Sequence, residues 1–241
     1  MAITMDFEVY LTRGGSPEEL LALEDQAGID VAVVMPRVSF RPDNIWHAEA
    51  LQGYDRLIGC ACVNPNFGQE AVEELRMAIT EWGLKGLKLM APAHNYSIAH
   101  PIVYPLMELA RELEIPVTIH SGPSPAHPLE IAATVLRYPE VPVIMDHMGH
   151  RGHQLEAIRA AEMCPNVYLG TTIAAFEPGT VKAAVEAIGP ERVVFGSNAP
   201  SAYPDLAVES IRRLKLGSEI EGLIFGENLA RIYKIETEGT T

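Results

Sequence analysis

Residues Pro116–Gly122 read PVTIHSG, and the fold is best worked out from this stretch. The run Val117–Ile119 is apolar and largely β-branched, which is typical of a buried strand. The run ends on His120 and then breaks at Ser121-Gly122. In a barrel of parallel strands, an imidazole at the end of a buried strand lies where the chemistry takes place. The interpretation depends on whether other strands end in the same way.

Similar strand-like runs recur along the chain, and each is followed by a segment with helical periodicity. The eight runs are Met5–Leu11, Ile29–Met35, Leu57–Val63, Gly86–Met90, Val117–His120, Val143–His147, Val167–Thr172 and Val193–Ser197. Several are apolar without alternation, which indicates parallel strands covered on both faces. Eight alternating units predict a closed (β/α)8 TIM barrel of class α/β, and residues 1–241 are expected to form a single domain.

Local signals support the helices between these runs. Ser16-Pro17-Glu18-Glu19 has the pattern of a capping box with proline at the first helical position. A closing helical stretch is expected over Ile220–Ile235, interrupted at Gly226. No GxGxxG motif follows the first strand, which disfavours an open dinucleotide-binding sheet.

The composition excludes several classes of partner. A net charge of −14 over 241 residues argues against nucleic acid, because phosphate binding needs clustered Lys and Arg. No stretch approaches the roughly 20 apolar residues of a membrane span, and the N-terminus lacks the pattern of a signal peptide. The three cysteines contain no CxxC pair. We expect a cytoplasmic protein with a small-molecule substrate, and the oligomeric state, a homo-oligomer included, stays open.

Polar side chains gather where the predicted strands end, and a barrel would bring these ends to one mouth. They are Glu8 and Tyr10, Asn64, Lys88, His120, Asp146 and His147, Thr171 and Thr172, and Ser197 and Asn198. Glu8 and Tyr10 are two residues apart and are expected to point the same way. Two histidines on consecutive strands, with a lysine and carboxylates nearby, predict an active site.

The ordered motifs of the chain resemble the amidohydrolase-related group of the amidohydrolase superfamily. The motifs are Gly83–Leu89 (GLKGLKL), Pro116–His120 (PVTIH), Asp146–Gly149 (DHMG), Val194–Pro200 (VFGSNAP) and Phe225–Tyr233 (FGENLARIY). The resemblance implies a TIM barrel and a divalent metal that activates water for hydrolysis, or related C–C cleavage and decarboxylation. It also implies metal ligands from an HxH motif on strand one, one histidine each on strands five and six, and an aspartate on strand eight.

The sequence departs from this pattern at most of the ligand positions. Glu8 and Tyr10 replace the two histidines of HxH, and Asn198 replaces the aspartate. Asparagine cannot accept the proton of a bound water, and a tyrosine is a poor ligand near neutrality. His120 and His147 match. A reduced set of Glu8, His120 and His147 remains compatible with one Zn, Mn or Fe ion, which we expect to be held weakly or not at all.

The leading hypothesis is an amidohydrolase-like hydrolase, or a related C–C lyase or decarboxylase, acting on a small carboxylated metabolite. His120 and His147 form its centre, with Glu8 as ligand or base. Lys88 is assigned as partner of a substrate anion and Asn198 as an orienting group. The predicted substrate contacts are Tyr10, His150, Asn64 and Ser197. Because neighbouring strand residues point to opposite faces, Asp146 is not expected to contact His147.

Three alternatives remain open from the sequence. The barrel could have lost catalysis and kept a ligand-binding or scaffolding role. It could open an ester or lactone without metal, with His147 as base and Lys88 stabilising an anion. It could bind a phosphorylated metabolite at Gly170–Thr172 and Gly196-Ser197, where barrels often hold phosphate. His127 is expected to begin a helix, and His153 to lie in a first helical turn at the surface.

Overall fold

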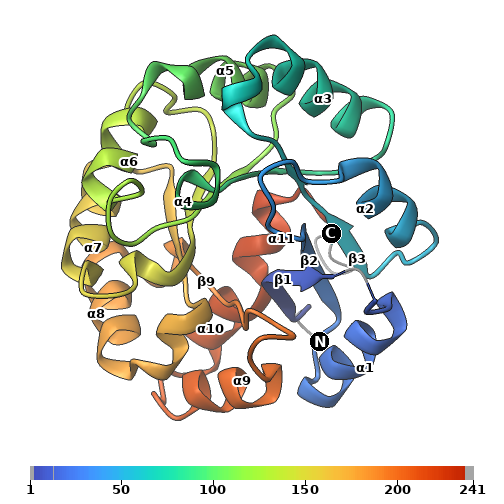
Figure 1. Ribbon diagram of the computed structural model, residues 1–241. Coiled ribbons are helices and arrows are strands. Elements are labelled where there is room, and N and C mark those ends of the chain that lie inside the picture. The colour runs from blue at the N-terminus through green and yellow to red at the C-terminus, as the bar shows by residue number, and fades with distance from the viewer. Residues whose placement is uncertain (1–2, 13, 237–241) are drawn as a thin grey trace.

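The computed structural model describes residues 3–12 and 14–236, which form short parallel strands surrounded by helices (Figure 1). The strands are β1 (Met5–Leu11), β2 (Val31–Pro36), β3 (Leu57–Gly59), β4 (Ala61–Cys62), β5 (Leu87–Leu89), β6 (Val117–Ile119), β7 (Val143–Met145), β8 (Val167–Gly170) and β9 (Val193–Val194). In Figure 1 the outer helices follow one another around the ring in chain order.

The helices alternate with the strands as the sequence predicts. They are α1 (Pro17–Ala27), α2 (Asn44–Leu51), α3 (Gln69–Thr80), α4 (Ala91–His94), α5 (Tyr104–Glu112), α6 (Pro128–Val135), α7 (Gln154–Met163), α8 (Pro178–Ile188), α9 (Pro204–Arg212), α10 (Ser218–Gly222) and α11 (Asn228–Ile232). The predicted capping box begins α1, since Ser16 and Glu19 exchange side-chain to backbone hydrogen bonds.

The third predicted run is divided at Cys60, which explains why residues 3–12 and 14–236 contain nine strands where eight were expected. Its first half, β3, pairs with β2, and its second half, β4, pairs with β5. The strands form a three-stranded sheet, β1 to β3, and a six-stranded sheet, β4 to β9. The N–H of Cys60 donates to the carbonyl of Val34 at 2.8 Å and links these two sheets. The N–H of Phe7 donates to the carbonyl of Phe195 at 3.1 Å and joins the first strand to the last. The arrangement is therefore the predicted eight-membered barrel.

The side chains of the strands alternate between two apolar layers. On β7, Val143 and Met145 pack against the helices, whereas Ile144 packs with Phe7 and Val33 inside the barrel. The same alternation on β5 directs Lys88 inward, because Leu87 and Leu89 belong to the outer layer. The fold thus places a charged side chain inside an apolar barrel.

The closing helical stretch covers one end of the barrel, and its predicted interruption is a π-helical turn over Leu223–Glu227. Gly226 lies in this turn, and a Cβ there would come within 1.8 Å of the carbonyl oxygen of Ile3. Only glycine allows the turn to approach the start of β1 this closely. The residues that follow pack into the barrel interior through Leu229 and Ile232.

A pair of buried carboxyl groups lies outside the barrel wall, between β1 and α1. Asp6 and Glu24 are at most 1% exposed, and Asp6 Oδ1 accepts the N–H of Ser197 at 2.7 Å. Burial raises the pKa of Asp6 to about 7 and that of Glu24 to about 10. The charge of Asp6 further raises the pKa of Glu24, whereas the hydrogen bond between the two groups lowers the pKa of Asp6. The folded chain therefore holds protons here that the unfolded chain releases.

This pair should make the protein less stable as pH rises. Between a carboxyl pKa of about 4.5 and the raised pKa, the folded state binds more protons than the unfolded state, so stability falls with increasing pH. Glu24→Gln should remove a decline on the order of a few kcal/mol between pH 5 and pH 9. Urea unfolding across this range measures the free energy of unfolding at each pH. Glu49→Gln is the control, because Glu49 is exposed. An undiminished decline in Glu24→Gln would contradict the explanation.

Candidate functional site

The candidate site lies at the C-terminal ends of four strands. Glu8 comes from β1, Lys88 from β5, His120 follows β6, and Asp146 and His147 follow β7. All except His120 are buried. These residues come together because parallel strands of a barrel end at one mouth. Gly122 lets the chain after His120 pass close to the next connection, since a Cβ there would meet the His150 carbonyl oxygen at 2.3 Å.

Glu8 reaches the site through an irregularity in β1. The register with β2 shifts between Asp6 and Val9, and Glu8 has a left-handed φ of 63°. Such a conformation is costly for a residue other than glycine and is concentrated at functional sites. The shift turns Glu8 inward next to Phe7. Tyr10 shares this side as predicted, and its hydroxyl donates to Glu8 Oε1 at 2.7 Å. Burial and the Glu8 charge raise the pKa of Tyr10 well above 10, so it stays a neutral phenol.

The chain also leaves regular geometry after β7, and one prediction is wrong there. The strand ends at Met145, and Asp146–Gly149 form a tight turn in which His147 has a φ of 57°. Strand alternation no longer applies in this turn, so Asp146 and His147 face the same centre. His147 Nε2 lies 3.6 Å from Asp146 Oδ1, a contact that alternation had excluded.

Lys88 joins the two carboxylates of the site. Its ammonium donates to Glu8 Oε1 at 2.6 Å and also to Asp146 Oδ2. Burial lowers the pKa of Lys88, but the charges of Asp146 and Glu8 outweigh this effect and raise it above its ordinary value. With 1% exposure and two carboxylate partners, Lys88 is not placed to bind a substrate anion as predicted. We reassign it as the internal cation that neutralises these carboxylates.

The two carboxylates differ in their pKa values. Burial raises the pKa of Asp146, but the charges of His147, Lys88 and His120 together hold it well below its ordinary range. For Glu8, burial and the charge of Asp146 raise the pKa. Asp146 is therefore the fixed anion of the site, and Glu8 is the carboxyl that more readily takes a proton.

Two hydroxyl groups hold the Asp146–Gly149 turn in place. The N–H of Ser121 donates to Asp146 Oδ1 at 2.8 Å, and the Ser121 hydroxyl donates to the Asp146 carbonyl and accepts the N–H of Gly149. Thr172 Oγ1 accepts the N–H of His147 at 2.9 Å and lies 2.6 Å from His147 Nδ1. The sequence analysis named Thr172 as a polar strand-end residue and as a phosphate contact, and Ser121 only as a turn residue, so neither was assigned this role.

Loss of the Thr172 hydroxyl should therefore impair the site without unfolding the protein. In Thr172→Val a side chain of similar shape remains, but the His147 ring loses the partner that fixes its orientation. We expect a 10- to 100-fold fall in kcat, of the order that a misplaced group costs. Thr172→Ser keeps the hydroxyl and is the matched control. Equal activity of the valine and serine variants would show that this contact does not position His147.

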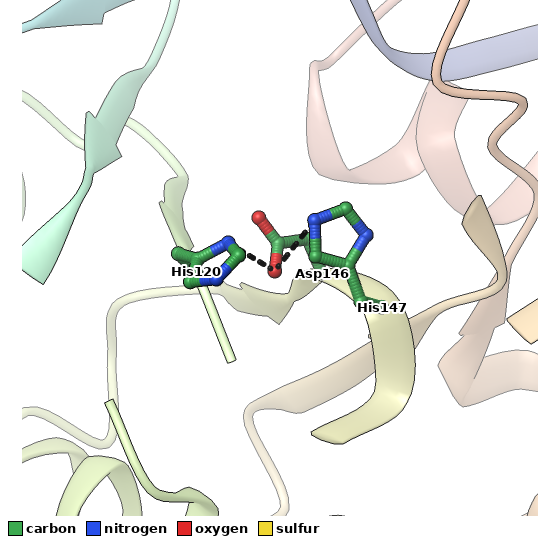
Figure 2. Close-up of side chains that lie close together, drawn as sticks. All are labelled: His120, Asp146 and His147. Carbon is green, nitrogen blue, oxygen red and sulfur yellow. Dashed lines mark ion pairs between the residues drawn. The ribbon is translucent and has the colours of Figure 1, made fainter. Parts of the chain in front are cut away.

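His120 and His147 flank the carboxylate of Asp146 (Figure 2). His120 Nδ1 lies 3.5 Å from Asp146 Oδ1, and the two imidazole rings are 5.0 Å apart between centroids. A quarter of the His120 side chain is exposed, but Nδ1 is buried, so its other nitrogen, Nε2, faces the mouth. Burial lowers the pKa of His120, but the Asp146 charge outweighs this effect and raises it above 6.5.

These three residues fit a divalent metal ion. One ligand atom each from His120, Asp146 and His147 lies within 4.8 Å of the others. Two imidazole nitrogens and a carboxylate oxygen are a donor set that Zn, Mn or Fe can use. The group contains Asp146 where the predicted ligand set had Glu8. Glu8 instead bonds Lys88 and Tyr10, and its free Oε2 lies 3.7 Å from His147 Nδ1.

Two of the other predicted substrate contacts, Ser197 and Asn64, are buried and make hydrogen bonds with nearby groups of the protein. Ser197 bonds Asp6 and the N–H of Ala199, and Asn64 caps the turn after β4. Asn198 is half-buried with a φ of 67°, and its side chain makes no hydrogen bond with other described residues. Its orienting role stays a prediction.

His150 lies near the two central histidines. Burial and the charges of Arg151 and His147 lower its pKa, and its Nε2 accepts from Arg151 Nε at 2.7 Å. A substrate contact of His150 thus stays a prediction. The phosphate alternative loses three of its donors, since the N–H groups of Thr171, Gly196 and Ser197 already donate to protein oxygens.

A family model described as "Amidohydrolase" matches residues 5–235. The chain belongs to the amidohydrolase family. No curated protein matches this family member in sequence. Within the described part of the chain, no helix has the length and apolar composition needed to cross a bilayer.

Solved structures similar to this amidohydrolase confirm the predicted TIM barrel. An uncharacterised TIM-barrel protein from Bordetella bronchiseptica is 18% identical, with a TM-score of 0.82 over 95% of this chain and 97% of that one. A 2,6-dihydroxybenzoate decarboxylase from Rhizobium is 18% identical, with a TM-score of 0.77 over 98% and 99% of the two chains. A 5-carboxyvanillate decarboxylase from Novosphingobium aromaticivorans, complexed with manganese and a nitrobenzoic acid, is 18% identical, with a TM-score of 0.77 over 97% and 96%.

Proposed function

We propose that this amidohydrolase-family protein removes a carboxyl group from a small carboxylated substrate, with His120 as the proton donor. The observation that carries the proposal is the placement of the His120 ring. Its Nδ1 faces the buried Asp146, and its Nε2 faces the mouth. A carboxylate partner stabilises the protonated ring. A protonated imidazole suits a step that needs a proton donor, whereas hydrolysis needs a base that takes a proton from water.

The proposed reaction is a decarboxylation in which a proton replaces the carboxyl group. The bond between the substrate carbon and its carboxyl group breaks, and the electron pair of that bond stays on the carbon. The proton on His120 Nε2 moves to this carbon, and CO2 leaves. The neutral imidazole regains a proton from water. Asp146 stabilises the protonated ring before transfer, and Lys88 and Ser121 keep Asp146 in place.

The similar structures support a substrate class. Two of them are decarboxylases of carboxylated aromatic compounds, 2,6-dihydroxybenzoate and 5-carboxyvanillate. We therefore propose a hydroxylated aromatic acid as substrate. Arg151, exposed beside His150 near the central histidines, replaces Lys88 as the proposed partner of its carboxylate.

A metal ion bound beside Asp146 would compete with the proton that His120 keeps on Nδ1. A divalent ion would be held by His120, Asp146 and His147 and would supply Lewis-acid polarisation of a substrate oxygen. Metal binding to histidine requires the deprotonated nitrogen. In the proposed reaction His120 Nδ1 keeps its proton, and Lys88 supplies a fixed positive charge beside Asp146. We therefore propose that catalysis does not require metal.

The test uses the full chain after treatment with a chelator. A panel of hydroxylated aromatic acids, including 2,6-dihydroxybenzoate and 5-carboxyvanillate, is assayed for CO2 release, and a parallel panel of aryl esters and lactones is assayed for hydrolysis. The proposal expects CO2 release without added metal. Hydrolysis without CO2 release would overturn it in favour of a hydrolase. No turnover on either panel would overturn it in favour of a barrel without catalysis, and a strict need for Mn²⁺ would refute the role of His120.

A further inference from the structure

We propose a second metal site at the rim of the barrel, formed by His127, His153 and Glu156, for a divalent transition cation such as Zn²⁺. One ligand atom from each side chain lies within 4.8 Å of the other two, and all three residues are half-buried. The site shares no residue with the central group of His120, Asp146 and His147. It does not depend on the proposed reaction.

The three side chains come from the starts of two neighbouring helices. His127 directly precedes α6 and His153 directly precedes α7, and these helices pack against each other. The two imidazole rings lie edge to face, with centroids 4.7 Å apart. Glu156 is three residues after His153 on the same helix face, and its Oε1 lies 3.9 Å from His153 Nδ1.

One nitrogen of this group has no hydrogen-bond partner. His153 Nδ1 is buried and makes no hydrogen bond with any other described residue. Buried polar atoms are usually hydrogen-bonded, so this unpaired nitrogen is available to a ligand. The nitrogen faces a carboxylate at a distance too long for a hydrogen bond but suited to a cation held between the two groups.

The donor set agrees with a transition metal. Two imidazoles and one carboxylate are ligands that Zn²⁺ takes at about 2.0–2.2 Å, with a water free to complete the tetrahedron. Ligand atoms around such an ion lie about 3.3 Å apart, so small rotations of these half-buried side chains would close the site. His127 Nδ1 accepts the N–H of Leu129 at 3.2 Å, which leaves Nε2 as the ligand atom. Binding there moves the ring proton to Nδ1 and ends that cap bond.

The location suggests what the ion does. The connection from β6 to α6 begins with His120 and ends with His127, and the connection from β7 to α7 begins with Asp146-His147 and ends with His153. A rim ion would therefore join the far ends of the two connections whose near ends form the central site. We expect it to restrain both connections and to raise the melting temperature.

The experiment measures Zn²⁺ binding by calorimetry on untagged, chelator-treated protein carrying His120→Gln, which removes a ligand from the central group. One Zn²⁺ per chain is expected in this background, together with a higher melting temperature. Adding His153→Ala should weaken binding at least tenfold and abolish the thermal shift. Adding Glu156→Gln should weaken binding as well, and this variant serves if His153→Ala fails to fold.

The matched control is His100→Ala in the same background. His100 caps a short helix through Nδ1 as His127 does, accepting the N–H of Ile102 at 3.2 Å, but it belongs to neither metal group. Its removal should leave Zn²⁺ affinity unchanged. If the His120→Gln protein binds no Zn²⁺, or if His153→Ala and Glu156→Gln bind it as tightly as their parent, the rim site does not exist.

Discussion

Replacement of Lys88 by methionine is expected to lower the free energy of unfolding by about 3–5 kcal/mol, as is typical when one partner of a buried ion pair is removed. The ammonium bonds both Glu8 and Asp146, and all three side chains are at most 1% exposed. Methionine fills a similar volume, so the loss reflects charge rather than packing. Without Lys88, the barrel interior keeps two carboxylates but loses the ammonium that bonds both of them.

Urea unfolding at pH 7 measures this loss. Lys85→Met is the control, because Lys85 lies three residues earlier on the same segment but is exposed. Adding Glu8→Gln to Lys88→Met removes one of the two carboxylates and should recover part of the stability. A loss below about 1 kcal/mol, the range of an exposed ion pair, would show that Lys88 does not neutralise a buried pair.

Replacement of His120 by glutamine is expected to lower kcat by about 10²- to 10⁴-fold, the usual contribution of a general acid. Stability should change little, since the ring is a quarter exposed and its Nδ1 makes no hydrogen bond with described residues. His100→Gln, at an exposed position outside the site, is the control.

The pH dependence gives a second readout for His120. Asp146 raises the pKa of this imidazole above 6.5 despite the opposing effect of burial, so the protonated donor is present below the raised pKa. The kcat of the wild type should fall as pH rises through it. The residual activity of His120→Gln should lack this alkaline decline. If the decline persists unchanged, another group supplies the proton.

The fold could be predicted because it depends on patterns that repeat along the chain. Each of the eight apolar runs overlaps a strand, and β1 has the predicted bounds Met5–Leu11. The gathering of Glu8, Lys88, His120 and His147 also followed from the rule that parallel strands end at one mouth. These inferences needed only the periodicity of short segments and the order of the strands along the chain, and both can be read from a sequence.

The contacts within the site could not be predicted in the same way. Left-handed backbone conformations occur at Glu8, His147 and Asn198. None of these residues is glycine, the residue type that usually marks such a conformation in a sequence. At His147 this conformation turned a predicted separation from Asp146 into a contact. Lys88 meets partners 80 and 58 residues away along the chain, and nothing in its local sequence distinguishes an internal ion pair from a substrate contact.

Turnover of a hydroxylated aromatic acid in D2O by chelator-treated protein tests whether His120 donates the proton that replaces the carboxyl group. We expect one CO2 released per product formed and one deuterium on the carbon that lost the carboxyl group. His120→Gln should show neither beyond its residual rate. A product that keeps its carboxyl carbon, or CO2 release at an equal rate in His120→Gln, would show that His120 is not the proton donor of a decarboxylation.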